Sequence, residues 1–391
     1  MIEYINYLYI HIPFCIKKCY YCDFYSIPLD TALKADYIKS LCKELNIRKP
    51  IAGDIRTVYI GGGTPTILSE DEISLIIRSI KNNFNINTDA EITIEANPKT
   101  INYNKALHLL KEGINRISIG VQSLNDYELN ILGRSHTVED SLSSIRDARR
   151  AGFENISVDL IYGIPDVQSG TKRPKKRIHE WIDTLKKVID LNPEHISAYE
   201  LTPEKGTPLY DDIKNKRLVL PEEETIEEMY YQGIDFFRSH GYIHYEISNF
   251  SRPKYECRHN LNYWDRGFYL GIGAGAHSFT GSRRSSNSKD IKRYINLLNE
   301  DIIPVDWESV ISDEEAIMEY IFLGLRKMEG VNIGNLLKDN GRQIKKAIDE
   351  LASYGLVELR DDVLKLKRKG ILIINEIIVK VLLHIEKNHP L

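Results

Sequence analysis

The chain has 391 residues, of which 42% are hydrophobic, and it carries 52 basic against 56 acidic residues for a net charge of −4. This balance gives no electrostatic reason to expect a nucleic-acid or anionic-membrane partner, and no apolar run reaches the roughly 18 residues that a membrane-spanning helix needs. The first residues lack a basic segment followed by an apolar one. We therefore expect a cytoplasmic protein in a reducing compartment.

Three of the five cysteines stand close together, directly behind a strand-like run at 7–12. They form the pattern Cys15-x-x-x-Cys19-x-x-Cys22. Soft thiolates on one short loop favour an iron–sulfur cluster. Three ligands are one fewer than a cubane cluster takes from protein, so one iron would be open to a substrate or cofactor.

Two other interpretations of the cysteines carry less weight. Structural zinc normally takes four protein ligands, and no second cysteine pair exists, although Cys257 and His259 are distant candidates. Five cysteines in a chain of this length are not a disulfide framework.

Runs rich in β-branched and aromatic residues alternate with helical patterns along the first half of the chain. The expected strands are Tyr7–Ile12, Thr57–Ile60, Glu91–Ala96, Arg116–Val121, Asn155–Tyr162 and His195–Leu201. The expected helices are Leu33–Ile47, Glu70–Asn83 with Ser69 as N-cap, Val138–Ala151 ending before Gly152, and Ile178–Leu191. Six βα units favour a parallel α/β barrel, open or closed, with both sheet faces covered.

Polar and glycine-rich features follow these strands at their carboxyl ends, the functional face of βα barrels. They are the cysteine loop, Gly61-Gly62-Gly63-Thr64-Pro65, Glu95, Gln122, Asp159 and Glu200. Singly, the glycine run could be a tight turn, Gln122 an ordinary strand end and Arg134 a surface residue. Glu95 and Asp159 stand among apolar residues, and buried carboxylates need partners. Together these features predict a binding site on one rim.

These motifs resemble the radical S-adenosylmethionine superfamily, and within it the coproporphyrinogen dehydrogenase-like branch. The resemblance runs from Tyr9-Ile-His-Ile-Pro-Phe-Cys15 through Gly61–Pro65, Ile94-Glu95, Gly120-Val-Gln122-Ser and Val158–Pro165 into the C-terminal region. It implies a partial (β/α)6 barrel with a [4Fe–4S] cluster on Cys15, Cys19 and Cys22. The amino and carboxylate groups of S-adenosylmethionine would chelate the fourth iron.

The resemblance also implies roles for further residues. Tyr9, Gly62 and Glu95 match positions that contact this first S-adenosylmethionine. The positions that match a second cofactor molecule in the dehydrogenase are Tyr21, Gly63, Thr64, Gln122, Arg134 and Asp159.

Within this branch, the sequence favours a heme chaperone over a dehydrogenase. The dehydrogenases continue the cluster motif with Cys-x-Cys and have a long N-terminal arm, whereas this chain reads Cys22-Asp23-Phe24 and has fourteen residues before Cys15. The run His259-Asn-Leu-Asn-Tyr-Trp264 matches the His-Asn-x-x-Tyr-Trp motif of the heme chaperones, which makes His259 the candidate heme ligand; Cys257 and His277 are rivals. The expected function is to bind heme and transfer it to acceptor proteins. The alternative is oxygen-independent oxidative decarboxylation of coproporphyrinogen III, and radical modification of RNA is a third hypothesis.

The expected domains are a barrel at 1–240, a barrel extension at 241–312 and a winged-helix-like unit at 313–391. Winged helices also serve as partner-docking modules, so the last unit does not by itself predict nucleic-acid binding. The basic stretch 168–177 is interpreted as a solvated surface loop, with contact to an anionic lipid or a propionate as the alternative. An electron donor such as a flavodoxin or ferredoxin is expected if radical chemistry occurs, and the sequence leaves homodimer formation open.

Overall fold

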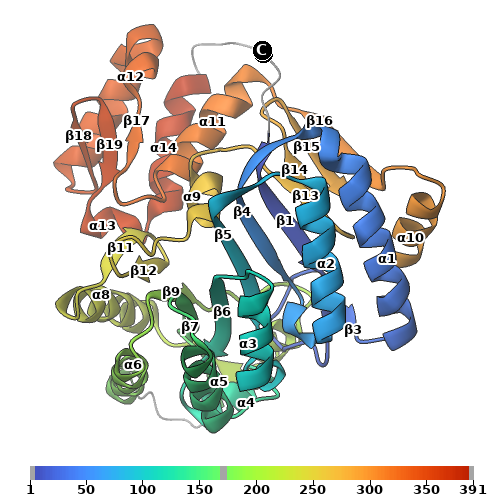
Figure 1. The fold of residues 1–391 in the computed structure, drawn as a ribbon. Coiled ribbons are helices and arrows are strands. Elements are labelled where there is room, and N and C mark those ends of the chain that lie inside the picture. Colours follow the sequence, from blue (N-terminus) through green and yellow to red (C-terminus); the bar gives the residue numbers. More distant parts are fainter. Residues whose placement is uncertain (1–4, 168–173, 387–391) are drawn as a thin grey trace.

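The computed structural model describes residues 5–167 and 174–386. Its centre is a nine-stranded sheet with the spatial order β11-β12-β9-β7-β6-β5-β4-β1-β13 (Figure 1). All neighbours from β13 to β9 are parallel, while β12 and β11 add antiparallel strands at one edge. The bounds of these strands, in chain order, are β1 Ile5–Ile12, β4 Ala52–Gly62, β5 Ile86–Ala96, β6 Arg116–Gln122, β7 Ile156–Tyr162, β9 His195–Glu200, β11 Ile243–Glu246, β12 Asn249–Ser251 and β13 Leu270–Ile272.

Helices follow the parallel strands and cover the outer side of the curved sheet (Figure 1). Their bounds are α1 Thr31–Arg48, α2 Glu70–Asn83, α3 Tyr103–Lys111, α4 Asp126–Ile131, α5 Val138–Ala151, α6 Pro174–Asp190, α7 Pro208–Lys214 and α8 Glu223–Ser239. Local chemistry sets their ends. Ser69 and Glu72 form a reciprocal capping box at the start of α2. Gly152 ends α5 with φ 111°, in the left-handed region that glycine adopts without a steric penalty.

The six predicted parallel strands and four predicted helices are all present, and the predicted fold class is confirmed. The bounds of α2 and α5 agree with the sequence pattern, whereas β4 begins five residues before its predicted start at Thr57. The parallel strand β13 was not predicted. It has three residues, too few for a periodic pattern, and it pairs with β1 from more than 250 residues away along the chain.

The two faces of the sheet differ in polarity. Buried apolar residues such as Ile10, Ile94, Ile119 and Val158 alternate along the strands with residues such as Glu95. The apolar set packs in the main core under the helices. The alternating polar set lines a cavity enclosed by the strands. The inner face of the barrel therefore offers polar groups to a ligand in this cavity.

The chain continues past the barrel with short elements. They are β2 Phe14–Cys15, β3 Ile27–Pro28, β8 Asp166–Val167, β10 Leu218–Val219, α9 Arg258–Trp264, β14 His277–Phe279, β15 Arg283–Asn287, α10 Ile291–Asn299 and β16 Val305–Val310. The C-terminal part contains α11 Asp313–Gly324, β17 Val331–Asn332, α12 Gly334–Ser353, β18 Val357–Arg360, β19 Val363–Leu366, α13 Arg368–Ile371 and α14 Ile374–Glu386.

The C-terminal elements have a hydrophobic core of their own, and the three short strands pair in the order β17-β19-β18. This arrangement of helices and a small antiparallel sheet is winged-helix-like. The unit stands on the barrel beside β11 and α9 (Figure 1). Arg368 forms an ion pair with Asp235 of α8, and Met328 donates a backbone hydrogen bond of 3.0 Å to Tyr245. The domain boundaries at 240 and 312 stay predictions.

No helix in 5–167 or 174–386 has the length and apolar character needed to cross a membrane. Within the basic stretch 168–177, residues 168–173 lie outside the described residues, as do the side chains of 174 and 175. Lys176 forms an ion pair with Glu180, and Arg177 forms one with Asp166.

Candidate functional site

A cavity of about 460 Å³ opens at the carboxyl ends of the parallel strands. Of the thirteen site residues predicted from the sequence, it brings together twelve and leaves out His259. Those that line it are Cys15, Cys19, Cys22, Tyr9, Tyr21, Gly62, Gly63, Thr64, Glu95, Gln122, Arg134 and Asp159. Residues more than 140 positions apart therefore share one wall, because parallel strands bring their carboxyl ends to the same edge.

The cysteine loop leaves β1 and is held at both ends by backbone pairing between β2 and β3. The backbone N–H of Cys22 donates to the carbonyl of Cys19 at 3.3 Å, which makes the second half of the loop a tight turn. All three thiols are free and partly exposed toward the cavity. Burial raises the pKa of Cys15, and it raises that of Cys22 to about 11. Metal binding would therefore have to displace their protons.

A cluster and a single metal ion make different demands on the three cysteines. Among residues 5–167 and 174–386, no three histidine, cysteine or acidic side chains converge closely enough to hold one metal ion. A single zinc ion needs ligands about 2.0–2.3 Å from one point. A cubane accepts ligands that are farther apart, because each cysteine binds a different iron. The cluster on Cys15, Cys19 and Cys22 stays a prediction.

The glycine turn after β4 packs against the cysteine loop. Gly63 donates its N–H to the carbonyl of Ile12 at 2.8 Å, and the Thr64 hydroxyl lies 3.7 Å from Sγ of Cys15. A Cβ atom on Gly63 would lie 2.7 Å from the carbonyl oxygen of Phe14 and 2.9 Å from Sγ of Cys15. Close approach to the cysteine loop is therefore the physical reason for a glycine at this position.

Glu95 lies at the end of β5 and is fixed by neutral donors. The Tyr59 hydroxyl donates to Oε1 at 2.9 Å and the Gly62 N–H donates to Oε2 at 3.0 Å. Burial, assisted by the nearby Asp159 carboxylate, raises the pKa of Glu95 to about 7. A cationic group in the cavity, such as an ammonium, would favour the ionised form. Tyr9 faces the same region, and its hydroxyl shares a hydrogen bond of 2.8 Å with Nδ1 of His11.

Arg134 connects the cysteine loop with β6. Its Nη1 donates to Sγ of Cys19 at 3.4 Å and its Nη2 donates to the carbonyl of Gly120 at 2.7 Å. Gln122 has φ 68°, an uncommon value for a residue other than glycine, and it ends β6 beside this guanidinium. These contacts exclude the interpretation of Arg134 as a solvated surface residue.

Asp159 is half-buried in the middle of β7. It accepts hydrogen bonds from the Ser118 hydroxyl at 3.0 and 3.1 Å. Burial raises its pKa, although the hydrogen bond from Ser118 opposes the shift. Tyr21, from the cysteine loop, lies beside Arg134, and burial raises the pKa of its hydroxyl.

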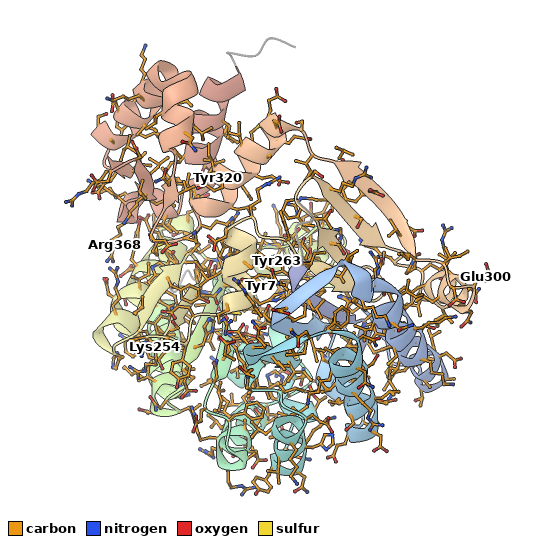
Figure 2. All side chains as sticks on the ribbon, turned by 45° about the horizontal axis from the view of Figure 1, so that its top comes forward. Tyr7, Lys254, Tyr263, Glu300, Tyr320 and Arg368 are labelled. Carbon is orange, nitrogen blue, oxygen red and sulfur yellow. The ribbon has the colours of Figure 1, made fainter. Side chains whose placement is uncertain are left out.

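His259 lies outside the cavity lining, inside the wall formed by β4 and α9. It is 1% exposed, and its two ring nitrogens are 2.6 Å from the Thr57 hydroxyl and 2.9 Å from the Tyr263 hydroxyl. Burial, with the Arg116 cation nearby, lowers its pKa to about 3. Figure 2 labels Tyr7 and Tyr263 near the middle of the molecule, and the His259 ring lies 6.3 Å and 5.0 Å from theirs. In this arrangement neither nitrogen is free to bind iron.

The two alternative heme ligands, Cys257 and His277, differ in their exposure to solvent. Cys257 is fully buried and its thiol lies 3.6 Å from Oε1 of Glu91, whereas His277 is exposed. Asn260, the next residue of the His-Asn-x-x-Tyr-Trp segment, does line the cavity. His259 as heme ligand stays a prediction, and it requires α9 to move.

Sequence reasoning missed several residues of the cavity wall. They are His11, Tyr59, Arg116, Ser118, Ser197 and Tyr199. The available signal was the alternation along β6, where Arg116, Ser118, Gly120 and Gln122 occupy every second position. A period of two places these residues on one face of the strand.

Comparisons with known proteins show which chains are similar to this one. The model of the radical SAM superfamily matches residues 9–171, and that of the HemN C-terminal domain matches residues 311–373. The heme chaperone HemW of Bacillus subtilis (strain 168) is 36% identical over 94% of this chain and 97% of its own length. The heme chaperone HemW of Escherichia coli (strain K12) is 37% identical over 69% of each chain. The solved structure of coproporphyrinogen III oxidase (HemN) from Escherichia coli, a radical SAM enzyme, superposes with a TM-score of 0.83 at 27% identity, covering 97% of this chain and 91% of that one.

Proposed function

The chain belongs to the HemW family of the radical SAM superfamily, and from this membership we propose that it binds heme and transfers it to acceptor proteins in the cytoplasm. The observation that carries the proposal is the position of α9. Its His-Asn-x-x-Tyr-Trp segment packs against the barrel wall, with Asn260 in the same cavity as the three cysteines. The segment proposed to bind heme would therefore lie next to the cofactor site.

The family implies a [4Fe–4S] cluster and S-adenosylmethionine. We propose that Cys15, Cys19 and Cys22 hold the cluster. When bound and reduced, the cluster supplies an electron that can cleave the sulfonium of S-adenosylmethionine. The protein's part is to bind the cofactor, orient it and limit the access of water.

For the cofactor itself, we propose that Glu95 accepts a hydrogen bond from the ammonium group, since it is the carboxylate nearest the glycine turn and its partners are neutral. Tyr9 and Gly62 line the same part of the cavity. The backbone at Gly62, with φ 117°, brings its N–H to Glu95 and fixes the carboxylate.

We propose a second cofactor position on the other side of the cysteine loop. Its residues would be Tyr21, Gly63, Thr64, Gln122, Arg134 and Asp159. Arg134 is the one cation in this set, so it would face a carboxylate. In a chaperone this position need not be filled for heme transfer.

The second candidate function is oxidative decarboxylation of coproporphyrinogen III. The likeness to coproporphyrinogen III oxidase favours it, at a TM-score of 0.83 over nearly the whole chain. Against it stands the sequence Cys22-Asp23-Phe24, where the dehydrogenases have Cys-x-Cys. Phe24 is 68% exposed and gives the loop an apolar surface in place of a further thiol.

One experiment separates the two functions. Anaerobically reconstituted protein is incubated with coproporphyrinogen III, S-adenosylmethionine and a reductant, or with a flavodoxin or ferredoxin as electron donor. In parallel, the same preparation is titrated with heme, and heme transfer to an apo-hemoprotein is followed by absorbance. We expect roughly stoichiometric heme binding, transfer, and no protoporphyrinogen IX. Several turnovers of decarboxylation would replace the chaperone assignment with the enzymatic one.

A further inference from the structure

Arg116 is a buried cation on the inner wall of the barrel. It begins β6, is 2% exposed and lines the cavity below Ser118. Its Nε is buried without a hydrogen-bond partner. Among residues 5–167 and 174–386 it forms no ion pair. Burial lowers the pKa of the guanidinium, but the surrounding Cys257, Glu91 and Tyr59 outweigh this effect and raise the pKa above its ordinary value.

This arrangement is costly for the protein on its own. A guanidinium carries five N–H donors and stays protonated. A buried N–H group without a hydrogen-bond partner costs free energy, because it has lost its bonds to water. Nothing in the packing of the apolar core requires an arginine here, because the outward-facing neighbours Ile117 and Ile119 supply the β6 contribution to that core.

The carboxylates near Arg116 are already bound to other donors. Glu91 accepts from the backbone N–H groups of Arg258 at 3.1 Å and His259 at 3.2 Å. Glu95 accepts hydrogen bonds from the Tyr59 hydroxyl and the Gly62 N–H. Asp159 accepts a hydrogen bond from the Ser118 hydroxyl. Each carboxylate thus has neutral donors of its own, and Nε of Arg116 remains buried without a partner.

The strand register places Arg116 deeper than the cofactor residues. It pairs with Thr93, whereas Glu95 pairs with Ser118, one inward-facing position nearer the carboxyl end of the strands. The guanidinium therefore lies under the site proposed for the S-adenosylmethionine ammonium. Around it, the rings of His195 and His259 are kept neutral by burial and by this same cation. No second cationic side chain competes for an anion at this depth among the described lining residues.

We propose that Arg116 binds a carboxylate group of a ligand that enters the barrel. The planar fork of a guanidinium matches a carboxylate through two parallel hydrogen bonds. The identity of the ligand rests on the proposed function: heme has two propionates as its anionic side groups, and S-adenosylmethionine has one amino-acid carboxylate. Both offer the same chemistry to Arg116.

The test compares cluster-loaded wild type, Arg116→Met and Arg116→Lys with four probes. The probes are heme, heme dimethyl ester, S-adenosylmethionine and its decarboxylated form. Met keeps the volume of the side chain and removes charge and donors, while Lys keeps the charge and removes the fork. Arg56→Met changes an exposed arginine of β4 and is the matched control.

For the probe whose carboxylate reaches Arg116, we expect Arg116→Met to weaken binding about ten- to a hundredfold, with a smaller loss in Arg116→Lys. The matching probe without the carboxylate should bind all variants equally. A loss confined to heme identifies a propionate, and one confined to S-adenosylmethionine identifies the amino-acid carboxylate. If wild type binds no heme, the proposed function fails, and the S-adenosylmethionine pair still decides the role of Arg116.

Thermal stability without probes gives an independent readout. The melting temperature of Arg116→Met shows whether the cation also serves the fold, because its charge acts to lower the pKa of the nearby Glu95 and Asp159 carboxyl groups. Unchanged affinity for both carboxylate probes would overturn the proposal. The proposal would also be overturned if the variant had a lower melting temperature and lost the same affinity for the probes with and without a carboxylate. That result would show that the cation of Arg116 is structural.

Discussion

The guanidinium of Arg134 donates a hydrogen bond of 3.4 Å to Sγ of Cys19, although the two residues are 115 positions apart. The same side chain donates to the carbonyl of Gly120 at 2.7 Å, so it holds the cysteine loop against β6. Positive charge and hydrogen bonds at a cysteine sulfur stabilise the reduced form of an iron–sulfur cluster. Arg134 is thus placed to influence the potential of a cluster as well as to bind an anionic ligand.

Arg134→Met should therefore shift the midpoint potential of the reconstituted cluster to a more negative value. The measurement is a redox titration followed by electron paramagnetic resonance. Arg150→Met, which changes an arginine packed on the Tyr103 ring away from the cysteine loop, is the control. An unchanged potential in Arg134→Met would show that the contact with Cys19 is lost when the cluster binds.

The cluster assignment predicts about four irons per chain after anaerobic reconstitution. Cys19→Ala should abolish the cluster absorbance, because two thiolates leave the cube under-ligated. Cys42→Ala is a matched control, since Cys42 is a partly buried cysteine of α1 outside the loop. Full iron content in Cys19→Ala, or zinc in the anaerobically purified protein, would contradict the assignment.

Gly63→Ala tests the contact between the glycine turn and the cysteine loop. The added methyl group would lie 2.9 Å from Sγ of Cys15, and the backbone of Phe14 blocks its other side. We expect a folded protein, by circular dichroism, that incorporates less iron than wild type. A variant with full iron content would show that the cysteine loop has room to shift away from β4.

Glu95→Gln should weaken S-adenosylmethionine binding by about 1.5–3 kcal/mol, the range for hydrogen bonds to charged groups. Because the pKa of the free carboxyl group is about 7, wild-type affinity should rise as the pH increases from about 6 to about 8 and then level off. Tyr59, Asp159 and Arg116 also face this carboxylate, so the glutamine variant serves as the reference for their titration. Calorimetry that finds the same pH dependence in both proteins would assign the proton to another group.

The stability of the ligand-free protein should depend on pH in the opposite direction. Folding raises the pKa of Glu95, so the folded state binds the proton more tightly than the unfolded state. Its contribution to stability is present below the unfolded pKa of about 4.3 and is lost as the pH rises through about 7. Urea titrations of wild type and Glu95→Gln over this interval measure the difference.

His259 needs a test that separates a heme ligand from a buried structural residue. Its removal leaves the Thr57 hydroxyl without its partner, so His259→Ala should lose about 1–3 kcal/mol of stability in either case. Tyr263→Phe removes the hydroxyl that engages Nε2. If His259 binds heme iron, Tyr263→Phe should keep or strengthen heme binding, while His259→Ala should shift the Soret band. A wild-type Soret band in His259→Ala, together with its change in His277→Ala, would move the ligand to the exposed histidine.

The sequence by itself determined the positions of six parallel strands and the cysteine motif. These features depend on interactions between residues that are close in the sequence. The Ser69 capping box sets the start of α2, and the spacing from Cys15 to Cys22 places three thiols on one loop. The pairing of polar residues with strand ends also followed from the sequence, because parallel strands share one functional edge. Twelve of the thirteen predicted residues accordingly line one cavity.

Only the tertiary structure decided what depends on contacts between distant segments. The pairing of β13 with β1, the bond between Arg134 and Cys19 and the burial of His259 between β4 and α9 each join residues more than 100 positions apart. The unpartnered Nε of Arg116 depends on where every neighbouring carboxylate finds its partner. A local pattern contains no information about such partners, because burial and hydrogen bonding are set by the segments that fold against a residue and not by its neighbours in the chain.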